Sequence, residues 1–194
     1  MGANSGLTQE SIREFVTAAH GDLPKLQALL QANPELLNAR DEEWNETALE
    51  AASHMGRRQI AEYLLSQGAP LTTCTAAMLG RGERVSEFLR SDPGQAQARG
   101  AHGIPVLFHA AIGGNTSIAE MLVTRGSMGL DAALQGAVGW GLFDMTKWLL
   151  EHGANPNEPN YEGKTALKVA LEGGDERLAD LLRGQGGEED PRTC

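Results

Sequence analysis

Two stretches of the sequence share one pattern: residues 46–56 read ETALEAASHMG, and residues 163–174 read GKTALKVALEGG. In both, alanine, leucine or valine occupies the first, second, fourth and fifth positions after a threonine, which is the spacing of one face of a helix. Each stretch then reaches a glycine, the residue that commonly ends a helix. Each therefore predicts one short helix that stops at a turn.

The glycine that follows this helix recurs along the whole chain, at Gly21, Gly56, Gly80, Gly114, Gly141 and Gly174. One or two alanines precede each of these glycines, and two large apolar residues follow about eight positions later, such as Leu64-Leu65 and Leu149-Leu150. Small residues let helices approach closely, and the leucine pairs fill the space between layers. Because one such unit cannot bury a core alone, the pattern predicts six stacked helix–turn–helix repeats, an all-α solenoid.

The chain resembles the ankyrin repeat family at this point. Residues 46–52 and 163–170 correspond to its T-P-L-H-x-A signature, and residues 64–69 and 149–157 to the ends of its repeats. Alanine and a charged residue replace the signature proline and histidine. The resemblance implies an α-solenoid with short hairpin loops over residues 10–184. We expect residues 1–9 to be a flexible N-terminus and residues 185–194 a disordered, acidic and glycine-rich tail.

The spacing of the repeats is uneven. Intervals of 24 and 27 residues, against 33 to 35 elsewhere, indicate that the third and fifth repeats lack most of the connecting hairpin. The first and third repeats end in Asn33-Pro34 and Asp92-Pro93, which predict a capped extra helical turn in the connection. Long loops should therefore project only after every second repeat. Ser11 and Glu14 fit a capping box that opens the first helix.

Composition excludes several functions. The 194 residues include 26 Asp and Glu against 16 Lys and Arg, a net charge of −10, which argues against binding nucleic acid or anionic membrane. Aromatic residues make up 5%, as thin layers of alanine and leucine would require. Two cysteines cannot form a disulfide scaffold, so we expect a reducing compartment, the cytoplasm.

The sequence gives little sign of catalysis, and we expect no enzyme activity, cofactor or metal. The five histidines lack the spacing of metal ligands, and a site built from different repeats would need them to converge across a linear stack. His109, beside Ala110, should be structural, whereas His20 and His54 should be solvated. Cys74 should be a small buried apolar residue.

The resemblance implies that hairpin tips and the ends of the inner helices bind a protein or peptide. Those positions are Glu43, Trp44, Glu46, His54, Met55, Met78, Leu79, His102, Ile112, Trp140, Tyr161 and Glu162. Five of them would form one apolar stripe, unless adjacent layers close over it and make it core: Met55, Met78, Leu79, Ile112 and Trp140. The acidic tips favour a basic partner. A monomer is favoured, and a homodimer that uses the same stripe is the alternative. Trp44 should stand free on its tip, and Trp148 should be core.

Overall fold

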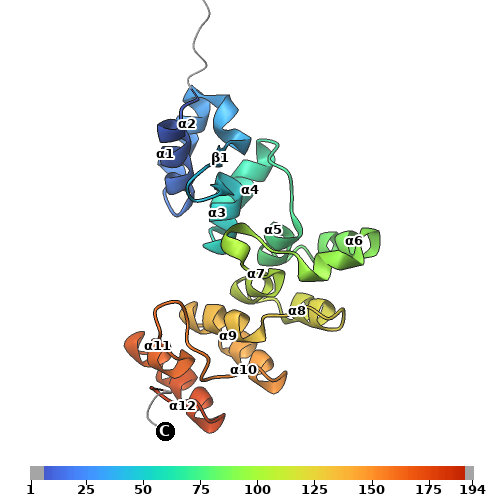
Figure 1. The fold of residues 1–194 in the computed structure, drawn as a ribbon, viewed down its shortest axis with the longest axis vertical. Coiled ribbons are helices and arrows are strands. Elements are labelled where there is room, and N and C mark those ends of the chain that lie inside the picture. Colours follow the sequence, from blue (N-terminus) through green and yellow to red (C-terminus); the bar gives the residue numbers. More distant parts are fainter. Residues whose placement is uncertain (1–6, 191–194) are drawn as a thin grey trace, which may run out of the picture.

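The computed structural model describes residues 7–190. Over this range the chain forms twelve α-helices, arranged as six antiparallel pairs that stack into one curved column (Figure 1). The first helix of each pair packs on its counterparts in the neighbouring pairs, so these helices form one layer. The pairs are α1 (Gln9–Ala19) with α2 (Leu23–Ala32), α3 (Ala48–His54) with α4 (Arg58–Ser66), α5 (Thr73–Met78) with α6 (Gly82–Ser91), α7 (Val106–Ile112) with α8 (Thr116–Val123), α9 (Leu130–Gly139) with α10 (Phe143–Glu151), and α11 (Ala166–Glu172) with α12 (Glu176–Gly184).

The core has the composition that the sequence pattern predicts. The alanines that precede the recurring glycines are fully buried in the middle repeats, for example Ala52, Ala77 and Ala111. At least one leucine of each large apolar pair is buried as well, as Leu64 and Leu149 show. Alanine therefore sets the close approach of the inner helices, and leucine fills the space between the two layers.

Glycine is required at most of the turns between paired helices. Five of the six recurring glycines have φ between 61° and 74°, in the left-handed region that residues with a Cβ rarely adopt. These five are Gly56, Gly80, Gly114, Gly141 and Gly174. The backbone reverses there within a few residues, so the second helix folds back on the first. This confirms the prediction of six helix–turn–helix units.

Connections between repeats alternate in length, as predicted. Residues 67–72 and 124–129 are short links, whereas residues 33–47, 92–105 and 152–165 form long loops. The first long loop contains an antiparallel hairpin of β1 (Arg40–Asp41) and β2 (Glu46–Thr47), with Arg40 opposite Thr47. The predicted extra turns are 3-10 helices, η1 (Pro34–Asn38) and η2 (Pro93–Gln97), capped by the side chains of Asn33 and Asp92. A third, η3 (Ala101–Gly103), precedes α7.

The two ends differ from the sequence prediction. Helix α1 is capped by Thr8 rather than Ser11; Ser11 is instead the third residue of the reciprocal capping box, and its side chain accepts from the Thr8 backbone N–H at 3.0 Å. At the other end, the Glu188 backbone N–H donates to Asn157 Oδ1 at 2.8 Å, and Thr165 Oγ1 donates to the Glu188 carbonyl at 2.6 Å. These bonds fasten residues after α12 to the last long loop, where disorder was expected. The rest of both predicted flexible ends, residues 1–6 and 191–194, lies outside the described residues.

None of the helices within residues 7–190 combines the length and apolar character that a bilayer-spanning helix requires.

Candidate functional site

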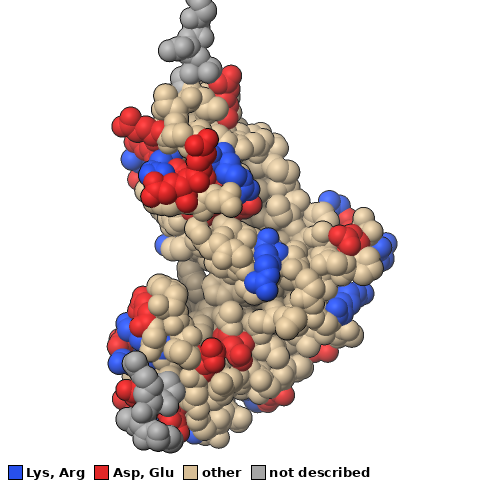
Figure 2. Space-filling view, in the orientation of Figure 1, with Lys and Arg blue, Asp and Glu red and all other residues tan. Residues whose placement is uncertain are grey.

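A groove of about 930 Å³ lies on the concave side of the column. Its walls are the end of α3, the start of α7, one face of α9, the last long loop and α11. Figure 2 shows the hollow between the N-terminal and C-terminal repeats, with mostly uncharged residues at its wall. Phe108, Trp140 and Val169 give this wall its apolar character. The groove brings together five of the residues that the sequence predicted to bind a partner, namely His54, Met55, Trp140, Tyr161 and Glu162.

Trp140 and Tyr161 are the exposed aromatic residues of this groove. Tyr161 is 96% exposed on the last long loop, and Trp140 is 44% exposed at the C-terminal end of α9. The Trp140 ring reaches the turn of the second repeat: a Cβ placed on Gly56 would lie 3.1 Å from its Cζ2, and the Arg57 guanidinium lies 5.8 Å from the ring centroid. Trp140 therefore connects the fifth repeat to the second along the inner surface.

The rim of the groove is acidic. Four acidic residues and one lysine line it, namely Asp131, Glu158, Glu162 and Glu172 with Lys164. The Lys164 ammonium contacts Glu172 at 2.8 Å and Glu162 at 2.9 Å, and these bonds raise the pKa of Lys164. The same bond from Lys164 lowers the pKa of Glu162. The positive charge is thus balanced locally, and a net negative rim remains.

One residue that lines the groove contains a buried hydrogen-bond acceptor without a donor. Gln135 on α9 donates through Nε2 to the Glu158 carbonyl at 2.7 Å, which fixes the orientation of its amide. Its Oε1 atom is buried, and no group within residues 7–190 donates to it. A buried acceptor without a donor costs free energy.

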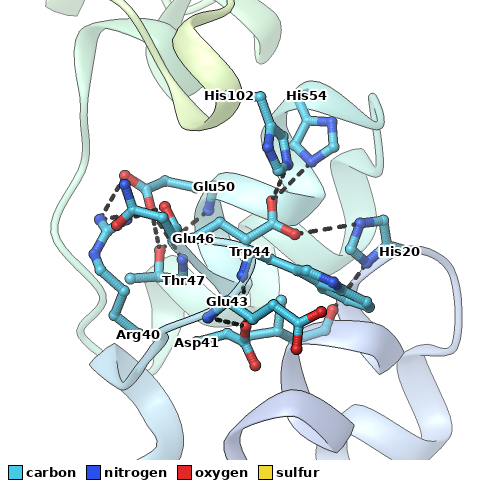
Figure 3. A network of polar contacts seen from close by, with 12 residues as sticks. His20, Arg40, Asp41, Glu43, Trp44, Glu46, Thr47, Glu50, His54 and His102 are labelled. Atoms are coloured by element: carbon cyan, nitrogen blue, oxygen red, sulfur yellow. Dashed lines mark hydrogen bonds and ion pairs between the residues drawn. The ribbon is translucent and has the colours of Figure 1, made fainter.

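A second feature, the histidine cluster, consists of His20, His54 and His102 around Glu46 (Figure 3). The Nε2 atoms of His54 and His102 lie 2.9 and 3.4 Å from Glu46 Oε2, and that of His20 lies 3.6 Å from Oε1. The Glu46 side chain is 1% exposed. Burial acts to raise its pKa, but the hydrogen bond with His54 and the attraction of the three imidazoles outweigh burial and lower it. The carboxylate is therefore ionised near neutral pH.

The first hairpin holds Glu46 in place through an ion pair with the first repeat. Asp41 is fully buried, contacts Arg13 Nε at 3.0 Å, and accepts the backbone N–H groups of Glu43 and Trp44. The bond from Arg13 is the largest of the effects that lower the pKa of Asp41. The hairpin is thereby fixed on α1, which places Glu46 beside His20.

Two family models match this chain. One, described as "Ankyrin repeat", matches residues 44–76, and the other, "Ankyrin repeats (many copies)", matches residues 130–183. The chain is an ankyrin repeat protein. No curated protein matches it. Repeats of this family are generally protein–protein interaction modules and typically not enzymes.

The predicted apolar stripe of this ankyrin repeat protein is not continuous surface. Met78, Leu79 and Ile112 are 0%, 5% and 8% exposed, so the interpretation as core is correct for these three. Helices α5 and α7 approach so closely that a Cβ on Gly113 would lie 2.5 Å from the Met78 carbonyl oxygen. Of the stripe, Met55 and Trp140 remain accessible.

Two of the predicted tip residues, Trp44 and Glu46, are less exposed than the sequence indicated. Trp44 is half-buried rather than free: its ring meets His20 edge-on at 5.8 Å, and the Arg13 guanidinium lies 5.5 Å from its centroid. Glu46 is buried, whereas Glu43 and His102 are exposed.

The prediction that the histidines do not converge is wrong. Three of them meet, and His20 and His54, expected to be solvated, have side chains only 28% and 11% exposed. The signal was present in the sequence, since His20 and His54 sit at equivalent ends of successive inner helices. That His102 joins the other two histidines could not be predicted, because its position depends on how the long loop of residues 92–105 folds.

The remaining histidine and cysteine predictions of this ankyrin repeat protein are confirmed. His109 is 1% exposed, contacts the Pro105 carbonyl oxygen at 3.0 Å, and burial lowers its pKa to about 4. Cys74 is buried, and burial raises its pKa to about 12, so its thiol stays protonated and unreactive.

The prediction for Trp148 is wrong. Trp148 is half-buried rather than core, and its ring stacks on that of His152, with ring centroids 3.8 Å apart.

Proposed function

We propose that this protein is a non-enzymatic adaptor whose concave groove binds a basic, partly apolar segment of another protein. The observation that carries this proposal is the combination of an apolar wall and an acidic rim in one groove of about 930 Å³. Apolar contacts supply affinity, and complementary charge supplies orientation and a faster encounter.

Trp140 and Tyr161 are the best candidates for the apolar contacts. Tryptophan and tyrosine are over-represented among residues that dominate binding free energy, because they bury a large area with few rotatable bonds. The exposed rings of Tyr161 and Trp140 line the same groove. A segment lying along the groove would contact both rings.

The charged groups favour a positively charged segment. The carboxylates of Asp131, Glu158 and Glu172 line the groove, and Lys164 already has two carboxylate partners. Lysine or arginine of the partner would therefore meet net negative potential.

The experiment is selection of binding peptides from a random library, followed by affinity measurement on variants. The selected peptides should be enriched in Lys and Arg, and their affinity should fall as salt is raised. Changing both Trp140 and Tyr161 to Ala should weaken binding tenfold or more, about 1.4 kcal/mol. The matched control is Met128→Ala, because Met128 is 69% exposed but does not line the groove. Peptides without basic residues, or an equal loss in the control, would contradict the proposal.

The homodimer alternative is weakened because three residues of its interface are core. Met78, Leu79 and Ile112 cannot reach a second copy without unfolding of the repeats that bury them. We therefore favour a monomeric adaptor. Sedimentation equilibrium should give a mass of one chain at all concentrations, and a mass that rises with concentration would restore the alternative.

A further inference from the structure

The histidine cluster joins parts of the chain that are distant in sequence. His20 ends α1, His54 ends α3, Glu46 lies in β2, and His102 lies in η3. One carboxylate thus faces three imidazoles that come from the first repeat, the second repeat and the loop before the fourth (Figure 3). Such convergence of the most common metal-ligand side chains does not follow from stacking alone.

The hydrogen bond of His20 leaves the second nitrogen of its ring as an acceptor beside Glu46. His20 Nδ1 lies 3.0 Å from the Val16 carbonyl oxygen, which can only accept, so Nδ1 carries a proton. In the neutral imidazole, the Nε2 lone pair therefore faces Glu46 Oε1 at 3.6 Å. This oxygen is buried, and no group in the described part of the chain donates a hydrogen bond to it. Two lone pairs that face each other repel, and a cation or a proton between them would relieve this repulsion.

The spacing of the ligand atoms fits a metal ion. One atom each from His20, Glu46 and His54 lies within 4.8 Å of the other two. In a tetrahedral zinc site with bonds of about 2.0–2.2 Å, ligand atoms are separated by about 3.4 Å. The Glu46 oxygens lie 2.9 Å from His54 Nε2 and 3.6 Å from His20 Nε2, on either side of this value. The 2.9 Å contact is a hydrogen bond, and the ion would take the place of its proton, which is released to solvent. The bond from His20 Nδ1 to a carbonyl is also the outer contact that usually orients a metal-binding imidazole.

We propose that His20, Glu46 and His54 bind one divalent transition-metal ion, Zn²⁺ in the first instance, with His102 as a further ligand. Two imidazoles and one carboxylate are a ligand set that zinc and related ions accept. His102 lies 3.4 Å from the same carboxylate, its side chain is 45% exposed, and its backbone has φ of 56°. That left-handed conformation is rare for a residue with a Cβ, and it holds the ring against His54, with centroids 5.2 Å apart.

The metal would act on both the stability and the surface of the protein. By linking α1, the first hairpin and α3 it would fasten the N-terminal repeats, and through His102 it would include the loop before α7. His54 also lines the groove, so the ion would lie close to the proposed binding surface. The metal proposal does not depend on peptide binding, and it is tested without a peptide.

The first test is calorimetric titration of the metal-free full chain with zinc chloride alone. A Cys194→Ser background removes the terminal thiol as an alternative ligand. One ion per chain should bind, and the melting temperature should rise by about 5 °C or more at a hundredfold excess over Kd. His54→Gln and Glu46→Gln should each lower the affinity tenfold or more. His152→Gln is the matched control, because His152 lies in the fifth repeat beside Trp148, and its affinity should be unchanged.

A second measurement uses the unmodified chain, in case a variant does not fold. Imidazole nitrogen resonances of His20 and His54 should shift on addition of zinc, and those of His109 and His152 should not. Absence of zinc binding, equal affinity in His54→Gln and His152→Gln, or shifts confined to other histidines would overturn the proposal. A His20 imidazole that holds protons on both nitrogens to pH 8 and does not respond to zinc would show that the charge is a proton, and would also overturn it.

Discussion

The same substitution, glycine to alanine, should have opposite effects at two positions of α9. A Cβ on Gly136 would lie 2.7 Å from Phe108 Cε2 and 2.9 Å from Ile112 Cγ2, closer than side-chain atoms normally approach. At Gly139, three residues later and exposed, the added carbon would have no atom of the described residues within 4 Å apart from its chain neighbours and the backbone of its own helix. The pair therefore separates the packing of α9 on α7 from the intrinsic preference of the helix.

Two energies compete in these variants. Alanine is favoured over glycine inside a helix by up to about 1 kcal/mol, and this gain is smaller at the helix end. Overfilling a packed interface costs about 1–3 kcal/mol, and two contacts below 3 Å place Gly136 toward the upper part of that range. We expect Gly136→Ala to destabilise the protein by about 1–2 kcal/mol, and Gly139→Ala to stabilise it by a few tenths of a kcal/mol.

Urea unfolding followed by circular dichroism measures both changes. With an m-value of about 2 kcal/mol/M, Gly136→Ala should lower the midpoint by about 0.5–1 M, and Gly139→Ala should raise it slightly. The strain would be relieved by movement of the Phe108 ring, which lines the groove, so peptide affinity should fall in Gly136→Ala as well. Stabilisation by Gly136→Ala would refute the reasoning, since it would mean that α7 and α9 are not in close contact.

Two further predictions concern the core and the response to acid. Met78→Ala should cost about 2–5 kcal/mol by leaving a cavity at a fully buried position, whereas Tyr161→Ala should change stability by no more than about 0.5 kcal/mol; urea midpoints compare them. If Met78→Ala cost as little as Tyr161→Ala, Met78 would be surface and not core. Because the pKa of Asp41 is lower in the folded protein than in the unfolded chain, its ion pair with Arg13 stabilises the fold at neutral pH and is lost as pH falls through the folded pKa. The stability difference between wild type and Asp41→Asn should therefore shrink as pH is lowered below about 4, and a difference that stays constant across this range would show that the pair contributes through shape alone.

The turns, helix pairs and helix caps could be predicted from the sequence because each depends on a few residues that are adjacent in the chain. Gly56 and Gly174 mark turns that need a positive φ, and alanine at Ala52 and Ala170 marks helices in close contact, so the repeat number and the helix pairs followed from spacing. The loops that carry Asn33-Pro34 and Asp92-Pro93 were predictable for the same reason, because capping depends on adjacent residues. At the N-terminus this local reasoning chose Ser11 where Thr8 is the cap, since both residues can fill that role.

The sequence by itself determined the repeats, the alternation of long and short loops and the acidic character of the surface, since each depends on residues close together in the chain. Only the tertiary structure decided which inner-helix ends are exposed and which distant side chains meet. Ile112 is buried because α7 packs tightly between its neighbours, while Trp140 remains accessible and reaches Gly56 three repeats away. His20, His54 and His102 lie up to 82 positions apart in sequence, and the curvature of the stack together with the folding of two loops brings them around the carboxylate of Glu46. These relationships depend on the sum of small rotations between repeats, which no local pattern encodes.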